Sequence, residues 1–163
     1  MEFIKFILSY TFMLFLVPCS FGQGQVSQNL NQILSVEDQD KSNPPKSLYV
    51  KLYATDVEVR HMKGTRVMVL GKVKLGVPNL FFLDVLIKKG RYALFLSPEG
   101  GTGLRLEDKE RQPMVLQGST CHEDVSYTIY VPETVSSVVL ENPQTGDSRV
   151  LAMQSGQNKP SFK

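Results

Sequence analysis

The sequence is poor in the residues that cross-link a chain, ligate metals or carry the largest aromatic surfaces. It has two cysteines, two histidines and no tryptophan. Cys19 falls in an apolar N-terminal segment, so the remainder of the chain keeps Cys121 alone and has no partner for an internal disulfide. A disulfide-stapled domain is therefore excluded. None is needed, because a domain of about 150 residues buries roughly two thirds of its unfolded surface.

Neither sign of charge dominates. Lys and Arg number 18 against 16 for Asp and Glu, and the formal net charge is +2. The densest charged stretch, residues 107–111 (EDKER), alternates acids with bases. Nucleic-acid binders instead gather Lys and Arg into a strongly positive surface. We therefore expect no nucleic-acid partner.

Long apolar runs are also missing, apart from one at the N-terminus. Residues 6–17 (FILSYTFMLFLV) follow Lys5 and end at Pro18. About a dozen apolar residues fit the core of a signal peptide, whereas a membrane-spanning helix needs about 20. The pattern predicts a signal peptide over residues 1–22 and an exported protein.

Small residues at positions Ser20 and Gly22 place the expected cleavage before Gln23. The alternative is that Cys19 becomes a lipidated N-terminus after LVPC. Pro18 disfavours this alternative, because it replaces the small residue that normally precedes a lipidated cysteine.

Residues 23–46 and 154–163 are polar and rich in Gln, Asn and Ser. Such segments bury too little apolar surface to offset the entropy lost on ordering. Leu30, Ile33 and Leu34 have helical spacing, but Pro44 and Pro45 would end any helix. The sequence predicts a flexible leader over 23–46 and a flexible tail over 154–163.

Between them, residues 47–153 alternate apolar and polar side chains in short runs separated by turn residues, the pattern of half-buried strands. The clearest run places Val125, Tyr127, Ile129 and Val131 on one face. The expected strands cover residues 48–54, 57–60, 67–75, 91–97, 104–107, 114–116, 125–131, 136–140 and 149–153. In contrast, residues 79–90 have helical spacing, with Asn79 as a potential N-cap and Gly90 as a stop.

No fixed-length repeat is present, which removes the usual signature of a propeller or a regular solenoid. The expected fold is mainly β: an irregular β-solenoid or a β-sandwich of about nine short strands with one short helix. It forms a single domain.

The stretches DVEVRHMKGTRVMVLGKV, NLFFLDVLIKKGRYALFL and YTIYVPETVSSVVLEN resemble the opening of the putative adhesin family of bacterial cell envelopes, which has a β-helical domain. This resemblance spans residues 57–139. It implies an exported, non-catalytic β-solenoid and carries over no active-site residues. The chain is short for the family and lacks the Gly/Ser/Asn-rich coils of longer members.

Two clusters are candidates for chemistry or binding. Cys121 and His122 precede Glu123 and Asp124, but neighbours on a strand face opposite ways, so four adjacent ligands cannot converge on one ion. His61 would have to join them as a ligand or a base. The other cluster is a Gly-rich tip, Glu99, Gly100, Gly101 and Thr102, which we interpret as a hairpin turn and a possible binding loop.

These features favour a non-enzymatic β domain of the envelope or the secreted fraction, with a structural or adhesive role. We expect no catalytic residue, metal or cofactor, and a location in the periplasm, on the cell surface or outside the cell. The partner would be an envelope component, a glycan or a protein. Two alternatives stay open: a small glycan- or ligand-binding module, and a cysteine- or metal-dependent enzyme centred on Cys121 and His122.

Overall fold

The computed structural model describes residues 24–36 and 43–153. This part of the chain forms eleven strands and one short helix, so the expectation of a mainly β fold is confirmed. The strands are β1 (Gln25–Leu34), β2 (Ser47–Lys51), β3 (Asp56–Met62), β4 (Val67–Gly76), β5 (Leu94–Glu99), β6 (Gly103–Asp108), β7 (Val115–Leu116), β8 (Ser119–Thr120), β9 (Glu123–Pro132), β10 (Ser137–Asn142) and β11 (Asp147–Ala152). The helix is α2 (Leu80–Lys88).

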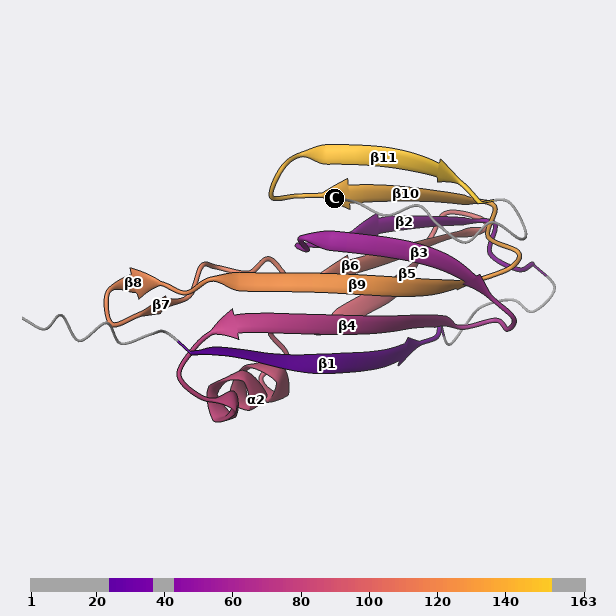
Figure 1. Cartoon of the computed structure of the whole chain (residues 1–163). Helices are drawn as coiled ribbons and strands as arrows, with labels where there is room; N and C mark the ends of the chain where they lie inside the picture. Colours follow the sequence, from indigo (N-terminus) through magenta and orange to yellow (C-terminus); the bar gives the residue numbers. More distant parts are fainter. Residues whose placement is uncertain (1–23, 37–42, 154–163) are drawn as a thin grey trace, which may run out of the picture.

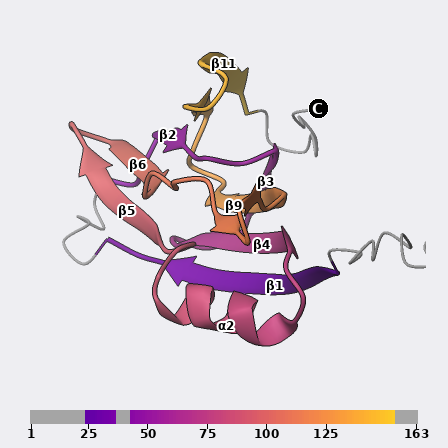
Figure 2. The ribbon, with the colours of Figure 1, turned by 90° about the vertical axis from the view of Figure 1, so that its left-hand side faces the viewer.

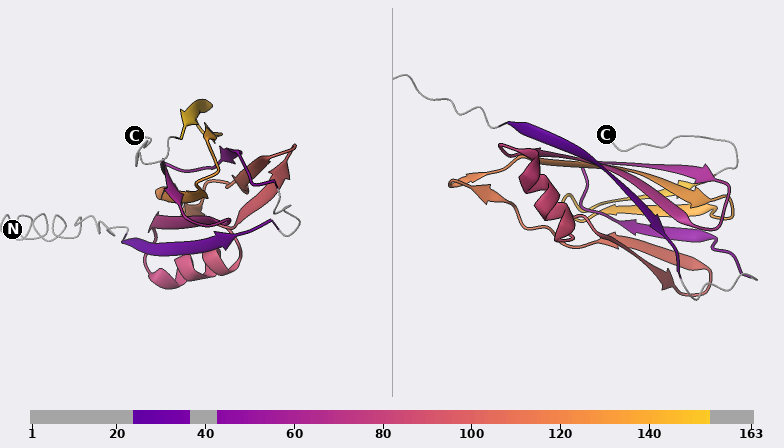
Figure 3. Two further views of the ribbon diagram at one scale, coloured as in Figure 1. Left: turned by 90° about the vertical axis from the view of Figure 1, so that its right-hand side faces the viewer. Right: turned by 90° about the horizontal axis from the view of Figure 1, so that it is seen from below.

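The strands form three sheets. Sheet A has the order β1-β4-β9-β3, sheet B has the order β11-β10-β2-β6-β5, and β7 pairs with β8 in a small hairpin. The two large sheets lie as two layers, and the hairpin extends beyond one end of them (Figures 1 and 3). Neither large sheet closes on itself in the described part of the chain.

Strand β9 is one of the two inner strands of sheet A and confirms the predicted alternation. It pairs with β4 antiparallel and with β3 parallel. Val125, Tyr127, Ile129 and Val131 are all buried, while the residues between them are partly exposed. These inward side chains belong to a single core that also takes Leu48 and other apolar residues of sheet B.

Tyr127 fits into this core because its neighbour on β4 is a glycine. Gly71 and Tyr127 are register partners. A Cβ atom on Gly71 would lie 2.9 Å from a Tyr127 ring carbon and 3.3 Å from the Leu30 Cβ. The missing side chain therefore makes the space that the tyrosine ring occupies.

Strand β1 corrects the sequence prediction. Residues 25–34 were expected to belong to a flexible leader, but they form a ten-residue edge strand antiparallel to β4. Leu30 is buried, and the Gln32 amide donates to the Tyr92 carbonyl at 3.0 Å and accepts from the Leu94 N–H at 3.2 Å. Gln32 thus connects the edge of sheet A to the start of β5 in sheet B. The predicted tail over 154–163 and signal peptide over 1–22 lie outside the described residues.

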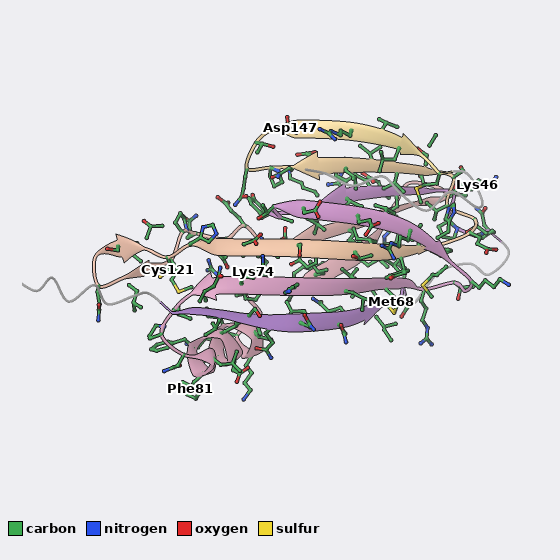
Figure 4. All side chains as sticks on the ribbon, in the orientation of Figure 1. Lys46, Met68, Lys74, Phe81, Cys121 and Asp147 are labelled. Atoms are coloured by element: carbon green, nitrogen blue, oxygen red, sulfur yellow. The ribbon has the colours of Figure 1, made fainter. Side chains whose placement is uncertain are left out.

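The predicted helix is confirmed, with Asn79 as its N-cap: the Asn79 side-chain oxygen accepts from the Phe82 N–H at 3.3 Å. Leu83 is fully buried, whereas Phe81 points away from the sheets (Figure 4). The helix runs beside β1, below the sheets (Figures 1 and 2). Within the described residues, no helix has the length and apolarity required to cross a membrane.

Candidate functional site

A pocket of about 390 Å³ opens at the end of the molecule where β9 begins and the β7–β8 hairpin is attached. Exposed side chains from three separate segments line it: Thr55, Thr120, His122 and Gln144. The half-buried Tyr53 contributes to its walls, with Cys121, Glu123 and the buried side chain of Arg111. Its size lies near the lower end of the range of small-molecule pockets.

A buried ion pair lies at the wall of this pocket. Asp108 ends β6, and its carboxylate accepts from Arg111 Nη1 at 2.7 Å and from the Tyr53 N–H at 3.0 Å. The two side chains are 0% and 5% exposed, respectively. Burial raises the pKa of Asp108 above its ordinary value, although Arg111 and the Tyr53 N–H both act to lower it. One carboxylate thus fixes the backbone after β2 and the loop after β6.

A second charged cluster joins the two sheets. Glu123 begins β9 in sheet A, and it accepts from Arg91 Nε at 3.0 Å and from Arg91 Nη2 at 2.8 Å. The Tyr92 hydroxyl donates to the same carboxylate at 2.6 Å. Burial acts to raise the pKa of Glu123. The hydrogen bonds from Arg91 and Tyr92, together with the positive charge of Arg91, outweigh burial, so the pKa lies below its ordinary value. Because Arg91 and Tyr92 precede β5 in sheet B, these bonds link the layers.

The two clusters adjoin each other. The Arg111 guanidinium carbon lies 5.5 Å from the centroid of the Tyr92 ring, a cation–π distance. The buried Tyr127 hydroxyl has no hydrogen-bond partner among the described residues. Burial raises the pKa of Tyr127 to about 12, and the charge of Arg111 partly opposes this rise. The tyrosine therefore stays neutral beside an ionic network whose charges balance.

The structure places Cys121 and His122 at the mouth of the pocket, but it does not bring His61 to them. Cys121 is 5% exposed, and its N–H donates to the Met114 carbonyl at 2.7 Å, while His122 is exposed. His61 is the register partner of Val131 at the other end of β9, where its Nε2 lies 2.9 Å from the Val135 oxygen. Ten positions along a strand span about 30 Å. The hypothesis that His61 serves as a third ligand or a base is therefore wrong.

In residues 24–36 and 43–153, no group of three or more His, Cys, Asp or Glu side chains is placed to hold a metal ion.

The predicted Gly-rich loop lies at the opposite end of the strands from Cys121. Glu99 to Thr102 form the turn between β5 and β6, and the Thr102 carbonyl accepts from the Lys46 N–H at 2.9 Å. Lys46 and Cys121 are labelled at the two ends of the molecule in Figure 4. Glu99 is engaged by Arg105 Nη2 at 2.6 Å, and a Cβ on Gly100 or Gly101 would meet open space. The loop is exposed and remains a predicted contact surface, separate from the pocket.

Sequence reasoning missed the residues that shape the pocket. Arg111 and Asp108 belong to the alternating charged stretch that was used only to argue against a nucleic-acid partner, and Arg91 was placed inside a strand. The one available signal was the position of Asp108 directly after the apolar alternation of Leu104 and Leu106. That position is compatible with burial but does not identify a partner.

Comparison with protein-family models, with curated proteins and with solved structures gave no match at the level required for an assignment.

Proposed function

We propose that this chain is a non-enzymatic exported β domain, of the envelope or the secreted fraction, with a structural or adhesive role. The observation that carries the proposal is the pairing of charges around the pocket. Arg111 is paired with Asp108 and Arg91 with Glu123, and the second pair connects sheet A to sheet B. Charges used in this way hold elements together and are not left free to donate or accept protons during a reaction.

The cysteine supports the same proposal. A catalytic thiol requires an electropositive, accessible setting and a base within hydrogen-bond reach. Cys121 is buried, its neighbour His122 is exposed to solvent, and His61 lies at the far end of β9. This arrangement suits a cysteine that packs as a small apolar residue.

The strand order supports the resemblance to the envelope adhesins. The chain passes from sheet B to sheet A between β2 and β3, and returns from A to B between β9 and β10. Both strands of the first passage pair in parallel with those of the second, β3 with β9 and β2 with β10. The two passages run in opposite senses between the sheets, but parallel pairing of strands from separate passages is also how the coils of a β-solenoid stack. We propose that the fold is an irregular sandwich that contains one solenoid-like step.

The proposal is tested with the mature protein, residues 23–163, coated on beads and mixed with cells of the producing organism or with their isolated envelopes. We expect the beads to retain cells or envelope material well above beads coated with albumin. Because the proposed role does not use the thiol or the imidazole, C121S and H122A should retain as much as the parent protein. Retention no higher than albumin, or a turnover activity abolished in C121S, would contradict the proposal.

A further inference from the structure

We propose that the pocket beside β9 is a binding site for a short, uncharged saccharide. The inference rests on the adhesive role proposed above and gives it a ligand. It places the site at the Cys121 end of the molecule, away from the Gly100 loop.

The charges of the pocket argue against a charged ligand. Its lining includes one cation, Arg111, and one carboxylate, Glu123. Each has a partner within the protein, Asp108 at 2.7 Å and Arg91 at 2.8 Å. A charged ligand would find both of these charges already paired. An anion would also be repelled by Glu123 and a cation by Arg111, so the charge of the ligand would stay poorly solvated and without a partner. A neutral ligand avoids this cost.

The rim of the pocket presents groups that both donate and accept hydrogen bonds. Thr55 and Thr120 supply hydroxyls, Gln144 supplies an amide, and His122 supplies an imidazole; all four are exposed. A sugar ring carries hydroxyls with the same double capacity, spaced closely around its edge. Several short contacts can therefore form at once.

Tyr53 lines the pocket, and we propose that a sugar ring stacks on its aromatic ring. Its backbone is held in place because its N–H donates to the buried Asp108 carboxylate. Asp108 also holds Arg111, so two walls of the pocket are fixed before any ligand arrives. Such preorganisation reduces the entropy lost on binding.

The backbone of the pocket wall makes a peptide strand a poor occupant. A peptide that binds as a strand needs unpaired N–H and C=O groups along a sheet edge. Here the Thr55 N–H already donates to the Val125 carbonyl at 2.8 Å, and the Cys121 N–H donates to the Met114 carbonyl at 2.7 Å. Recognition therefore depends on side chains, which favours a compact polyol.

The test uses fluorescently labelled mature protein on an array that carries neutral trisaccharides (β-glucan, α-glucan, xylan and chitin fragments) and acidic ones (oligogalacturonate and sialyllactose). We expect binding to at least one neutral trisaccharide. In titrations with that sugar, Y53A should weaken binding at least tenfold and Y53F should retain it. T120W, which fills the mouth of the pocket from an exposed position, should abolish binding. The matched control Y130A, on the outer face of β9, should bind like the parent.

The midpoint of urea denaturation shows whether each variant folds. If Y53A does not fold, T120W still tests the site. Binding to acidic sugars alone, or to no sugar on the array, would overturn the inference. Binding of a neutral trisaccharide that is unchanged in Y53A and T120W would also overturn the inference, because the binding site would then lie elsewhere. None of these results affects the bead assay, so the adhesive proposal stands or falls separately.

Discussion

The buried pair of Asp108 and Arg111 gives the sharpest test of how the charges beside the pocket stabilise the fold. The variant R111M removes the guanidinium while keeping much of the aliphatic bulk. Asp108, whose side chain is 0% exposed, then keeps the hydrogen bond from the Tyr53 N–H but loses its charged partner. Breaking a buried ion pair by removing one partner costs about 3–5 kcal/mol. Since domains are stable by about 5–15 kcal/mol in total, the variant should lose a large fraction of its stability.

The loss should depend on pH in a defined direction. The pKa of Asp108 is already raised by burial, and removal of Arg111 raises it further. A carboxyl group whose pKa is higher in the folded state favours folding when it is protonated. The loss of stability caused by the ionised carboxylate is present above the pKa that Asp108 has in the folded protein. This loss decreases as the pH falls through that pKa. The gap in stability between R111M and the parent should therefore be widest near about pH 7 and narrower near about pH 5.

Urea denaturation of the mature protein, followed by far-ultraviolet circular dichroism at both pH values, measures this gap. The exposed arginine variant R66M serves as the control and should lose less than about 0.5 kcal/mol. The double variant D108N/R111M should recover part of the loss, because it no longer buries a charge. A single variant R111M as stable as R66M at neutral pH would refute the reasoning.

Three further predictions follow from the strand pattern, the cysteine and the N-terminus. I129D places an unpaired charge in the core and should prevent folding. T128D places its charge on the outward face opposite Glu58 and should cost no more than about 1 kcal/mol of stability. Coinciding thermal melts of the two variants would show that the buried face is misassigned. The buried Cys121 thiol should react slowly with iodoacetamide in the folded protein and quickly in urea, and fast labelling of the folded protein would promote the enzyme hypothesis. Mass spectrometry of the exported protein should find Gln23 at the N-terminus, and an acylated Cys19 would place the protein on a membrane instead.

Local patterns were enough to predict the parts of the fold that local chemistry determines. The alternation in β9 was predictable because the inward residues from Val125 to Val131 are apolar or aromatic and the residues between them carry polar groups. The helix was predictable because Asn79 and the spacing of Leu83 and Ile87 agree on one element. In both cases side-chain chemistry and backbone period indicate the same structure.

Strand β1 was missed because two of the five residues on its inward face are polar. Val26, Leu30 and Leu34 alternate with Gln28 and Gln32 on that face. Counting glutamine as a surface residue hides the period of two and leaves the accidental helical spacing of Leu30 and Leu34. Gln32 can point inward because two backbone groups near β5 satisfy its amide. That compensation exists only in three dimensions.

The pocket was unpredictable for a related reason. Its walls come from residues near 53, 111, 121 and 144, which approach one another because distant strands pair in parallel. The same pairing directions carry His61 away from Cys121. No local pattern specifies which strands become neighbours, so neither outcome follows from the residues alone.

The parallel pairs also bear on when this chain can fold. Lys46, at the start of β2, bonds with Ser136, 90 residues later, and β10 completes the pairing of β2. Contacts between such distant residues raise the contact order and slow folding. Sheet B cannot be completed until β10 and β11 have been synthesised, so β2 gains its second neighbour only when nearly the whole chain is present. The export proposed above would be served by this late completion, because a chain that crosses a translocation channel in an extended form must not yet hold its native structure.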